Sequence, residues 1–267
     1  MKKYFVTLTY LIIIVCFMIP ILSLFAIALS EGFDVYWQAI KHEEALEAIR
    51  LSIIIALIAV PINLVFGIGA SWCIAKFDFP GKSMLTALID LPFAISPVIS
   101  GFIFLTIFGM DSVLGSWLAS HGIQFIFAIP AIVIATMFIT LPFIARELIP
   151  LMQEHGNEEE EAAIALGASG IKTFWYITLP NIKWGILYGI LISLSRAFGE
   201  FGAVSVVSGH IRGKTTSIPM HVEILYNEYN YVAAFSVASV LAILAIITMI
   251  LKNSLLSVKN VDLEKSQ

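Results

Sequence analysis

Long apolar runs separated by short polar segments dominate the chain. Several runs contain proline or glycine, which membrane helices tolerate where neighbouring helices or water satisfy the freed backbone groups. No run shows the ten-residue alternation of a membrane β-strand. Because about 20 apolar residues cross roughly 30 Å of hydrocarbon, the pattern predicts an all-α, polytopic membrane protein with six transmembrane helices. The predicted spans cover roughly residues 4–29, 51–75, 85–108, 125–148, 182–208 and 232–251.

The composition supports a membrane protein and excludes several other classes. The 267 residues are 59% hydrophobic and 13% charged, and the mean hydropathy is +0.94. A soluble domain cannot bury that much apolar surface, so lipid must be the solvent. The net charge of −4 points to no nucleic acid. The five histidines are scattered, and Cys16 and Cys73 fall inside apolar runs, so we expect neither a metal site nor a disulfide.

Basic residues predict the orientation of the spans, because cytoplasmic loops are rich in Lys and Arg. With the N-terminus inside, ten basic residues fall in cytoplasmic segments and four in external ones. We therefore expect both termini in the cytoplasm, and the resemblance described below implies that the membrane is the bacterial inner membrane. Lys2 and Lys3 also resemble the start of a secretory signal, but the run that follows is longer than a typical signal core. The cytoplasmic set is Lys2, Lys3, Lys76, Lys82, Arg146, Lys172, Lys183, Lys252, Lys259 and Lys265, and the external set is Lys41, Arg50, Arg212 and Lys214.

The longest polar interruption, residues 149–181, has the pattern of a helical hairpin. Asn157 is a candidate N-cap, and Glu160 three residues later would complete a capping box. A Gly-Ala-Ser-Gly cluster predicts a break, after which Ser169 is a candidate cap for a second helix that ends near Pro180. Two interpretations remain open on physical grounds: a solvated loop, or a compact knob that docks into the cleft of a soluble partner.

Residues in this hairpin match the EAA motif of ABC importer permeases at every fixed position and spacing. In that family the motif forms coupling helices that insert into a separate ATP-hydrolysing subunit. The chain has no Walker A pattern, GxxxxGK(S/T). The resemblance thus implies a non-catalytic membrane subunit that binds no cofactor itself, with ATP and Mg²⁺ on the partner ATPase. The matching residues are Glu161, Ala162, Ala163, Gly167, Ile177, Leu179 and Pro180.

Further segments resemble the CysW family of sulfate/thiosulfate importer permeases over about residues 10–255. The amino-acid sequences of residues 56–68, 90–101 and 196–215 carry this resemblance. A GEFGA core is typical of this family, whereas the related CysT family typically carries a GEYGS-type version. Residues 221–230 follow only the general pattern, which weakens inference about contacts with an external binding protein.

The resemblance implies a fold and an assembly. The fold is a single membrane domain, residues 1–267, with a MetI-like type I importer core of about residues 47–251 and a first helix that wraps a neighbour. The partners are a CysT-like second permease subunit, a dimer of ATP-binding subunits, an external sulfate-binding protein and membrane lipid.

Alternatives remain for the substrate and for the class of protein. Molybdate and tungstate are tetrahedral dianions like sulfate, so an importer of those anions is the first alternative. A secondary anion transporter or a channel, independent of ATP, is the second, although neither would need the cytoplasmic hairpin. An intramembrane enzyme would need paired catalytic groups inside the spans, but we expect all five histidines to lie outside the spans, in loops.

Arg196 and Glu200 form a candidate charge pair inside the fifth span. Charged residues at that depth usually face a bundle interior or a water-filled path, and their i,i+4 spacing allows pairing. Gly199 and Gly202 would let the helix unwind or pack closely there. A structural lock and a gate in the pathway are both consistent with this pattern. Glu200 itself should repel a dianion, so the candidate hydroxyl donors for an oxyanion are Ser96, Ser100, Ser193, Ser205 and Ser208.

Overall fold

The computed structural model describes residues 2–265, and the side chains of residues 4–254. Every regular element in this part of the chain is a helix, which confirms the predicted all-α class. Four helices are long and apolar enough to cross a membrane. Two bent helix pairs, Lys82–Ala94 with Pro97–Phe108 and Gly170–Asn181 with Lys183–Phe198, raise the possible number of spans to six. The four are α1 (Lys2–Ala28), α3 (Glu43–Lys76), α7 (Ile129–Glu154) and α14 (Tyr231–Lys265).

The third predicted span, residues 85–108, is not one straight helix. It is divided into α4 (Lys82–Ala94) and α5 (Pro97–Phe108), which meet at an angle of 108°. Proline disfavours a helical conformation in the residue before it, and Ser96 accordingly has ψ 136°. The predicted span is thus made of two half-helices, because Pro97 starts a new helix in a new direction.

The fifth predicted span, residues 182–208, is also interrupted. Helix α11 (Lys183–Phe198) ends just before Gly199, and the short helix α12 (Gly202–Val207) begins after Glu200 and Phe201. The expectation of a continuous helix was wrong, whereas the expectation that the flanking glycines permit unwinding and close packing agrees with the structure. A Cβ atom at Gly202 would lie 2.8 Å from Pro97 Cβ.

The two interruptions therefore lie side by side. Gly101 of α5 packs equally closely on the other half-helix, since a Cβ there would lie 2.8 Å from the carbonyl oxygen of Ala203. Small residues are the usual means by which membrane helices bring their backbones together. These contacts make α5 and α12 one packed unit in the middle of the protein.

The core of the bundle is formed by α3, α7 and α11. Gly67 of α3 and Gly189 of α11 both approach Ile144 of α7. A Cβ atom at Gly67 would lie 2.7 Å from the nearest atom of Ile144, and a Cβ atom at Gly189 would lie 3.4 Å from it. Ile144 is fully buried in a cluster with Leu148 and Met152. A separate apolar cluster surrounds Ile132, Ile139 and Val204 further along the bundle.

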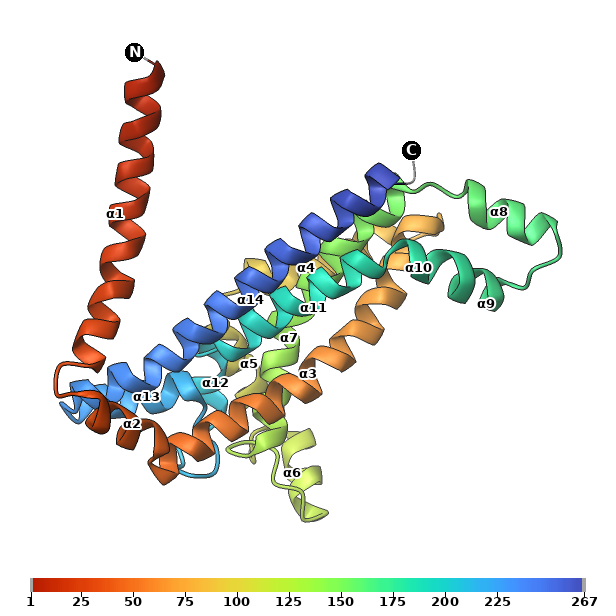
Figure 1. The fold of residues 1–267 in the computed structure, drawn as a ribbon. Coiled ribbons are helices and arrows are strands. Elements are labelled where there is room, and N and C mark those ends of the chain that lie inside the picture. The colour runs from red at the N-terminus through yellow and green to blue at the C-terminus, as the bar shows by residue number, and fades with distance from the viewer. Residues whose placement is uncertain (1, 266–267) are drawn as a thin grey trace.

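The outer helices leave large apolar surfaces open. Only 6% of the most apolar window of α1 is buried, compared with 56% for α7. Figure 1 shows α1 diverging from the bundle, with contact to the rest of the chain near its C-terminal end. Such a surface needs lipid or another subunit to cover it. The implied wrapping of a neighbour by this helix stays a prediction.

Short helices lie at the two ends of the bundle (Figure 1). One end holds the predicted hairpin and the C-terminal end of α14. The opposite end holds α2 (Phe33–Lys41), α6 (Val113–Ser120) and α13 (Ile218–Asn227). The hairpin consists of α8 (Glu158–Ala165), α9 (Gly170–Thr173), a π-helical turn (Phe174–Thr178) and α10 (Leu179–Asn181).

Which end faces the cytoplasm stays a prediction, as do the proposed core boundaries. The side chains of four residues in the basic set used for that prediction lie outside the described part: Lys2, Lys3, Lys259 and Lys265.

Candidate functional site

The hairpin has the predicted turn but not the predicted first cap. Helix α8 begins directly after Asn157, whose side chain makes no capping hydrogen bond. The capping box was therefore wrong, because the Glu160 carboxylate turns away from the backbone toward other partners. Ser169 does cap the second helix, since its hydroxyl accepts a hydrogen bond from the Lys172 amide at 3.5 Å.

Gly167 provides the turn between the two arms of the hairpin. Its φ of +92° lies in the region that favours glycine. A Cβ atom at this position would meet no other atom within 4 Å. A larger residue would therefore strain the backbone and protrude from the tip, without disturbing packing inside the chain.

The hairpin presents an apolar surface on segments other than the four long candidate spans. Leu166 is 89% exposed and Tyr176 is 80% exposed. Glu161 and Ala162 of the motif are exposed as well, while Ala163, Ile177 and Leu179 are partly covered. Exposed apolar groups clustered in this way mark an interaction surface. The remaining exposed members are Ile164, Ile171 and Trp175.

The base of the hairpin contains a buried ion pair that sequence analysis missed. Lys76 Nζ lies 2.9 Å from Glu160 Oε2, and the two side chains are only 6% and 15% exposed. Thr178 donates a hydrogen bond of 2.6 Å to Glu160 Oε1. The pattern of the chain contains no signal for this pair, because Lys76 and Glu160 are remote in sequence.

The interrupted fifth span brings Arg196 and Glu200 together. Arg196 Nη2 lies 2.6 Å from Glu200 Oε2, with side chains 32% and 1% exposed. Glu200 lies beyond the end of α11 rather than on its face, and its second oxygen accepts the Ala203 amide at 2.9 Å. One carboxylate thus joins the end of α11 to the start of α12. The role of this pair in transport stays a prediction.

The candidate serines divide into two places. Ser96 and Ser100 lie at the start of α5, and Ser205 and Ser208 lie in or directly after α12, so the contact between these half-helices brings the four into one region. Ser193 instead continues the buried stripe of α11. Its hydroxyl is buried without a hydrogen-bond partner. Three of the other hydroxyls donate hydrogen bonds within the chain. Ser100 donates to the carbonyl oxygen of Ser96, Ser205 donates to that of Gly202, and Ser208 donates to the sulfur of Met220.

Charged side chains open onto one face of the membrane-spanning region. Arg196 lines a groove of about 400 Å³ together with Phe143 and Lys252. Phe143 contacts the Phe93 ring at a centroid distance of 5.2 Å, and Arg146 lies over the same ring at 4.2 Å. Arg146 also donates a hydrogen bond of 2.7 Å to Asp90, and these two side chains are 55% and 38% exposed.

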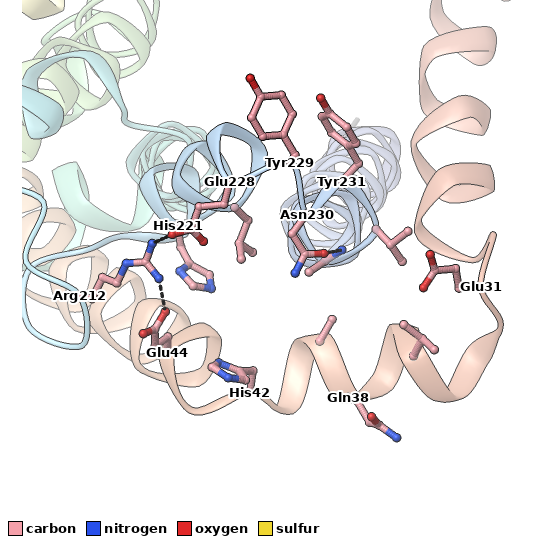
Figure 2. A pocket seen from close by; sticks show the side chains of 15 residues that line it. Glu31, Gln38, His42, Glu44, Arg212, His221, Glu228, Tyr229, Asn230 and Tyr231 are labelled. Carbon is pink, nitrogen blue, oxygen red and sulfur yellow. Dashed lines mark hydrogen bonds and ion pairs between the residues drawn. The ribbon is translucent and has the colours of Figure 1, made fainter.

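A polar pocket of about 570 Å³ lies at the end of the bundle opposite the hairpin. Figure 2 shows Arg212 between Glu44 of α3 and Glu228, directly after α13, with ion pairs to both. The hydrogen bond to Glu228 is the main reason that the pKa of Arg212 is raised. Burial lowers the pKa of His221, so its imidazole is neutral near pH 7. No cluster able to hold a metal ion was found among the described residues.

This pocket was not predicted from the sequence. Among its charged residues, Arg212 was considered only in the count of basic residues. The residues that pair with Arg212 come from segments far apart in the sequence. The only signal was the charged and aromatic character of residues 221–230, which the resemblance did not interpret.

An all-α membrane bundle with interrupted spans and an exposed hairpin fits the membrane component of a transport system. Residues 63–257 match the family described as "Binding-protein-dependent transport system inner membrane component", and the chain belongs to this family. The predicted type of fold is thereby confirmed.

Within the family, the chain is similar to sulfate permeases. It is 48% identical over 238 residues to the Sulfate transport system permease protein CysW of Escherichia coli, covering 89% of this chain and 82% of that protein. It is 46% identical over 254 residues to CysW of Synechocystis sp., covering 95% and 92%. Identity to CysT of Escherichia coli is 31% over 240 residues, covering 90% and 87%. The predicted resemblance to the CysW family is confirmed.

A solved structure has a similar fold. It is described as the crystal structure of a bacterial alginate ABC transporter in complex with an alginate pentasaccharide-bound periplasmic protein. The TM-score is 0.78 at 18% sequence identity, and the match covers 95% of this chain and 93% of that chain. At this identity the likeness concerns the fold alone.

Proposed function

We propose that this chain is the CysW-type permease subunit of an ATP-driven importer and forms part of the transmembrane pathway for sulfate or thiosulfate. The observation that carries the proposal is the 48% identity to a sulfate permease over 89% of the chain. The exposed hairpin supports an ATP-driven importer over a channel or secondary transporter, because those would leave its apolar surface without a partner. No feature of the pathway favours molybdate or tungstate.

In this proposal the hairpin docks onto the ATP-binding subunits. The motif residues Glu161–Ala163 and the exposed Leu166 and Tyr176 would enter a cleft of the ATPase dimer. ATP and Mg²⁺ would be bound there, and the present chain would take no catalytic part. The turn at Gly167 supports this role, because its positive φ connects the two arms and leaves Leu166 exposed beside it.

The face with exposed charges would meet the second, CysT-like permease subunit. Partly exposed Arg196 lies inside the fifth predicted span, and the partly exposed pair of Asp90 and Arg146 lies near the predicted cytoplasmic ends of the third and fourth spans. Charges at this depth are costly in lipid and face protein or water. A second subunit on this face would enclose the groove beside Arg196 as a path for a dianion, with serine hydroxyls at the helix interruptions as weaker donors.

The polar pocket opposite the hairpin would then face the external sulfate-binding protein, with both termini in the cytoplasm. A reporter fused after Ser120 or Lys214 is expected outside the cell, and one fused after Gly156 inside. An external reporter at Gly156 would contradict this orientation. Gln267, the natural fourth fusion point, lies outside the described residues.

Reconstitution tests the function itself. The chain is co-purified with the CysT-like subunit and the ATPase and placed in proteoliposomes, with the sulfate-binding protein outside and ATP inside. We expect uptake of radiolabelled sulfate that requires ATP and competes with thiosulfate. Uptake without ATP would support a channel or secondary transporter, and preferential uptake of molybdate would support the other importer.

A further inference from the structure

The junction beneath the hairpin ties together segments that are remote in sequence. Lys76 is the last residue of α3, and Glu160 lies in the first turn of α8. Both side chains are largely buried, and their charged atoms are 2.9 Å apart. Lys76 also donates a hydrogen bond to the carbonyl of Gly156, in the turn that connects α7 to the hairpin.

Glu160 extends the junction to the second arm of the hairpin. Its Oε2 faces Lys76, and its Oε1 accepts the hydroxyl of Thr178, which is itself buried just before α10. Both carboxylate oxygens are thus in use, one for a membrane helix and one for the returning arm. A buried charge with every partner in place is strongly sensitive to the loss of one of them.

Other contacts at the hairpin differ in kind. Glu159 accepts a hydrogen bond from Asn181, which joins one arm of the hairpin to the other without reaching α3. Phe174 packs on Trp72 of α3 at a ring-centroid distance of 5.3 Å, a contact without strict direction. The Lys76–Glu160 pair therefore supplies a directional polar link between the first arm and α3.

We propose that Lys76 and Glu160 are positioning residues that form the joint between the coupling hairpin and helix α3. Through this joint, a displacement of the hairpin by the ATPase moves α3, and with it the packed core of α7 and α11. The inference rests on the proposed function and adds to it the residues that transmit the movement. Neither residue touches ATP or substrate.

Helix α3 is suited to carry such a displacement across the membrane. Its 34 residues correspond to about 50 Å at 1.5 Å per residue. At its far end, Glu44 is held by Arg212 at 3.2 Å, beside the pocket shown in Figure 2. The same helix thus contacts the hairpin at one end and the polar pocket at the other.

The test compares three variants in the complete importer: Glu160→Gln, Lys76→Met and the control Glu159→Gln. The control removes a neighbouring charge whose partner, Asn181, lies within the hairpin. Two quantities are measured in proteoliposomes: ATP hydrolysis stimulated by the binding protein, and sulfate transported per ATP. Co-purification of the ATPase reports on assembly.

We expect Glu160→Gln and Lys76→Met to retain the ATPase and to transport roughly tenfold less sulfate per ATP, within the range of typical coupling between sites. Glu159→Gln should resemble the wild type. The double variant should be no worse than either single variant, because residues that act through each other are not additive.

Three results would overturn the joint: a wild-type ratio of sulfate to ATP in both single variants, loss of the ATPase subunit from both, or an additive loss in the double variant. Loss of the ATPase would show that the pair shapes the docking surface instead. Failure of the wild-type complex to transport sulfate would instead overturn the proposed function, so the two failures are distinguishable.

Discussion

Two carboxylates, the largely buried Glu160 and the fully buried Glu200, are paired with basic residues, but they join different kinds of segment. Glu160 links α8 to the end of α3, remote in sequence, and it lies outside the membrane-crossing helices. Glu200 links Arg196 to the start of α12 across a local interruption. The first pair connects two helices that are far apart in the sequence, α3 and α8. The second pair stabilises the local conformation at the break between α11 and α12.

We therefore expect the first pair to transmit movement and the second pair to maintain local structure. Movement of the hairpin relative to α3 must load the Lys76–Glu160 pair, because no continuous helix connects them. A movement of α5 and α12 as one unit can leave the Arg196–Glu200 pair intact. Uncoupling without loss of protein is therefore expected at the first pair, and loss of protein at the second.

The largest effect on sulfate uptake is expected at the tip of the hairpin, where the ATPase is proposed to bind. Gly167→Asp places a side chain on a backbone with φ +92° and adds a charge to the docking surface. We expect a correctly inserted chain, ATPase recruitment that is clearly weakened and sulfate uptake near background. The matched control is Gly170→Ala, where no positive φ is present and a Cβ would meet nothing within 4 Å. Normal recruitment and uptake in Gly167→Asp would contradict the docking role.

The next effect concerns the pair within the span. Arg196→Gln or Glu200→Gln leaves one charge without its partner, at a cost on the order of 3–5 kcal/mol, whereas replacing both can be nearly neutral. We expect lower membrane abundance in each single variant, recovered abundance in the double variant, and no recovery of uptake. Arg50→Gln is the control, since its pair with Glu47 is exposed and 3.9 Å long.

Each outcome for this pair has a distinct meaning. Recovery of uptake in the double variant would restrict the pair to a structural role. Single variants with wild-type abundance and uptake would show that the pairing itself does not matter.

A smaller effect is expected from closer packing at the interruptions. Gly202→Ala forces a Cβ to within 2.8 Å of Pro97, whereas at Gly199 the nearest atom would be at 3.7 Å. Overpacking of this kind typically costs about 1–3 kcal/mol. Thermal unfolding of the purified complex should thus shift downward for Gly202→Ala and little for Gly199→Ala. Equal shifts in unfolding temperature for the two variants would show that α5 and α12 can move apart at little cost.

The smallest effect is expected at the polar pocket. Arg212 is 40% exposed although it pairs with two carboxylates, and exposed ion pairs contribute about 0–1 kcal/mol. Arg212→Gln should leave abundance unchanged and the free energy of unfolding within about 1 kcal/mol of the wild type. A large loss of abundance would show that the pocket anchors α3 as firmly as the hairpin junction does.

Periodic and local features of the chain were predictable from the sequence, and remote contacts were not. The apolar runs predicted the spans, the glycine cluster predicted the turn of the hairpin, and Gly199 and Gly202 indicated that the helix could unwind near Glu200. The bend before Pro97 was missed because membrane helices often contain proline. The Lys76–Glu160 pair was missed because the capping-box pattern offered Glu160 a plausible local partner, and only the packed fold decides between partners.

The contact between α5 and α12 also has a consequence for biosynthesis. Helix α5 has 12 residues and α12 has six, so each is too short to cross roughly 30 Å of hydrocarbon alone. The ribosome completes α5 long before Gly202 emerges. Until then, the bend before Pro97 lacks its contact with Gly202, which is one source of the protein cover that irregular backbone needs inside a membrane. Stable packing of this part of the chain is therefore expected only after the segment that contains Gly202 has been made.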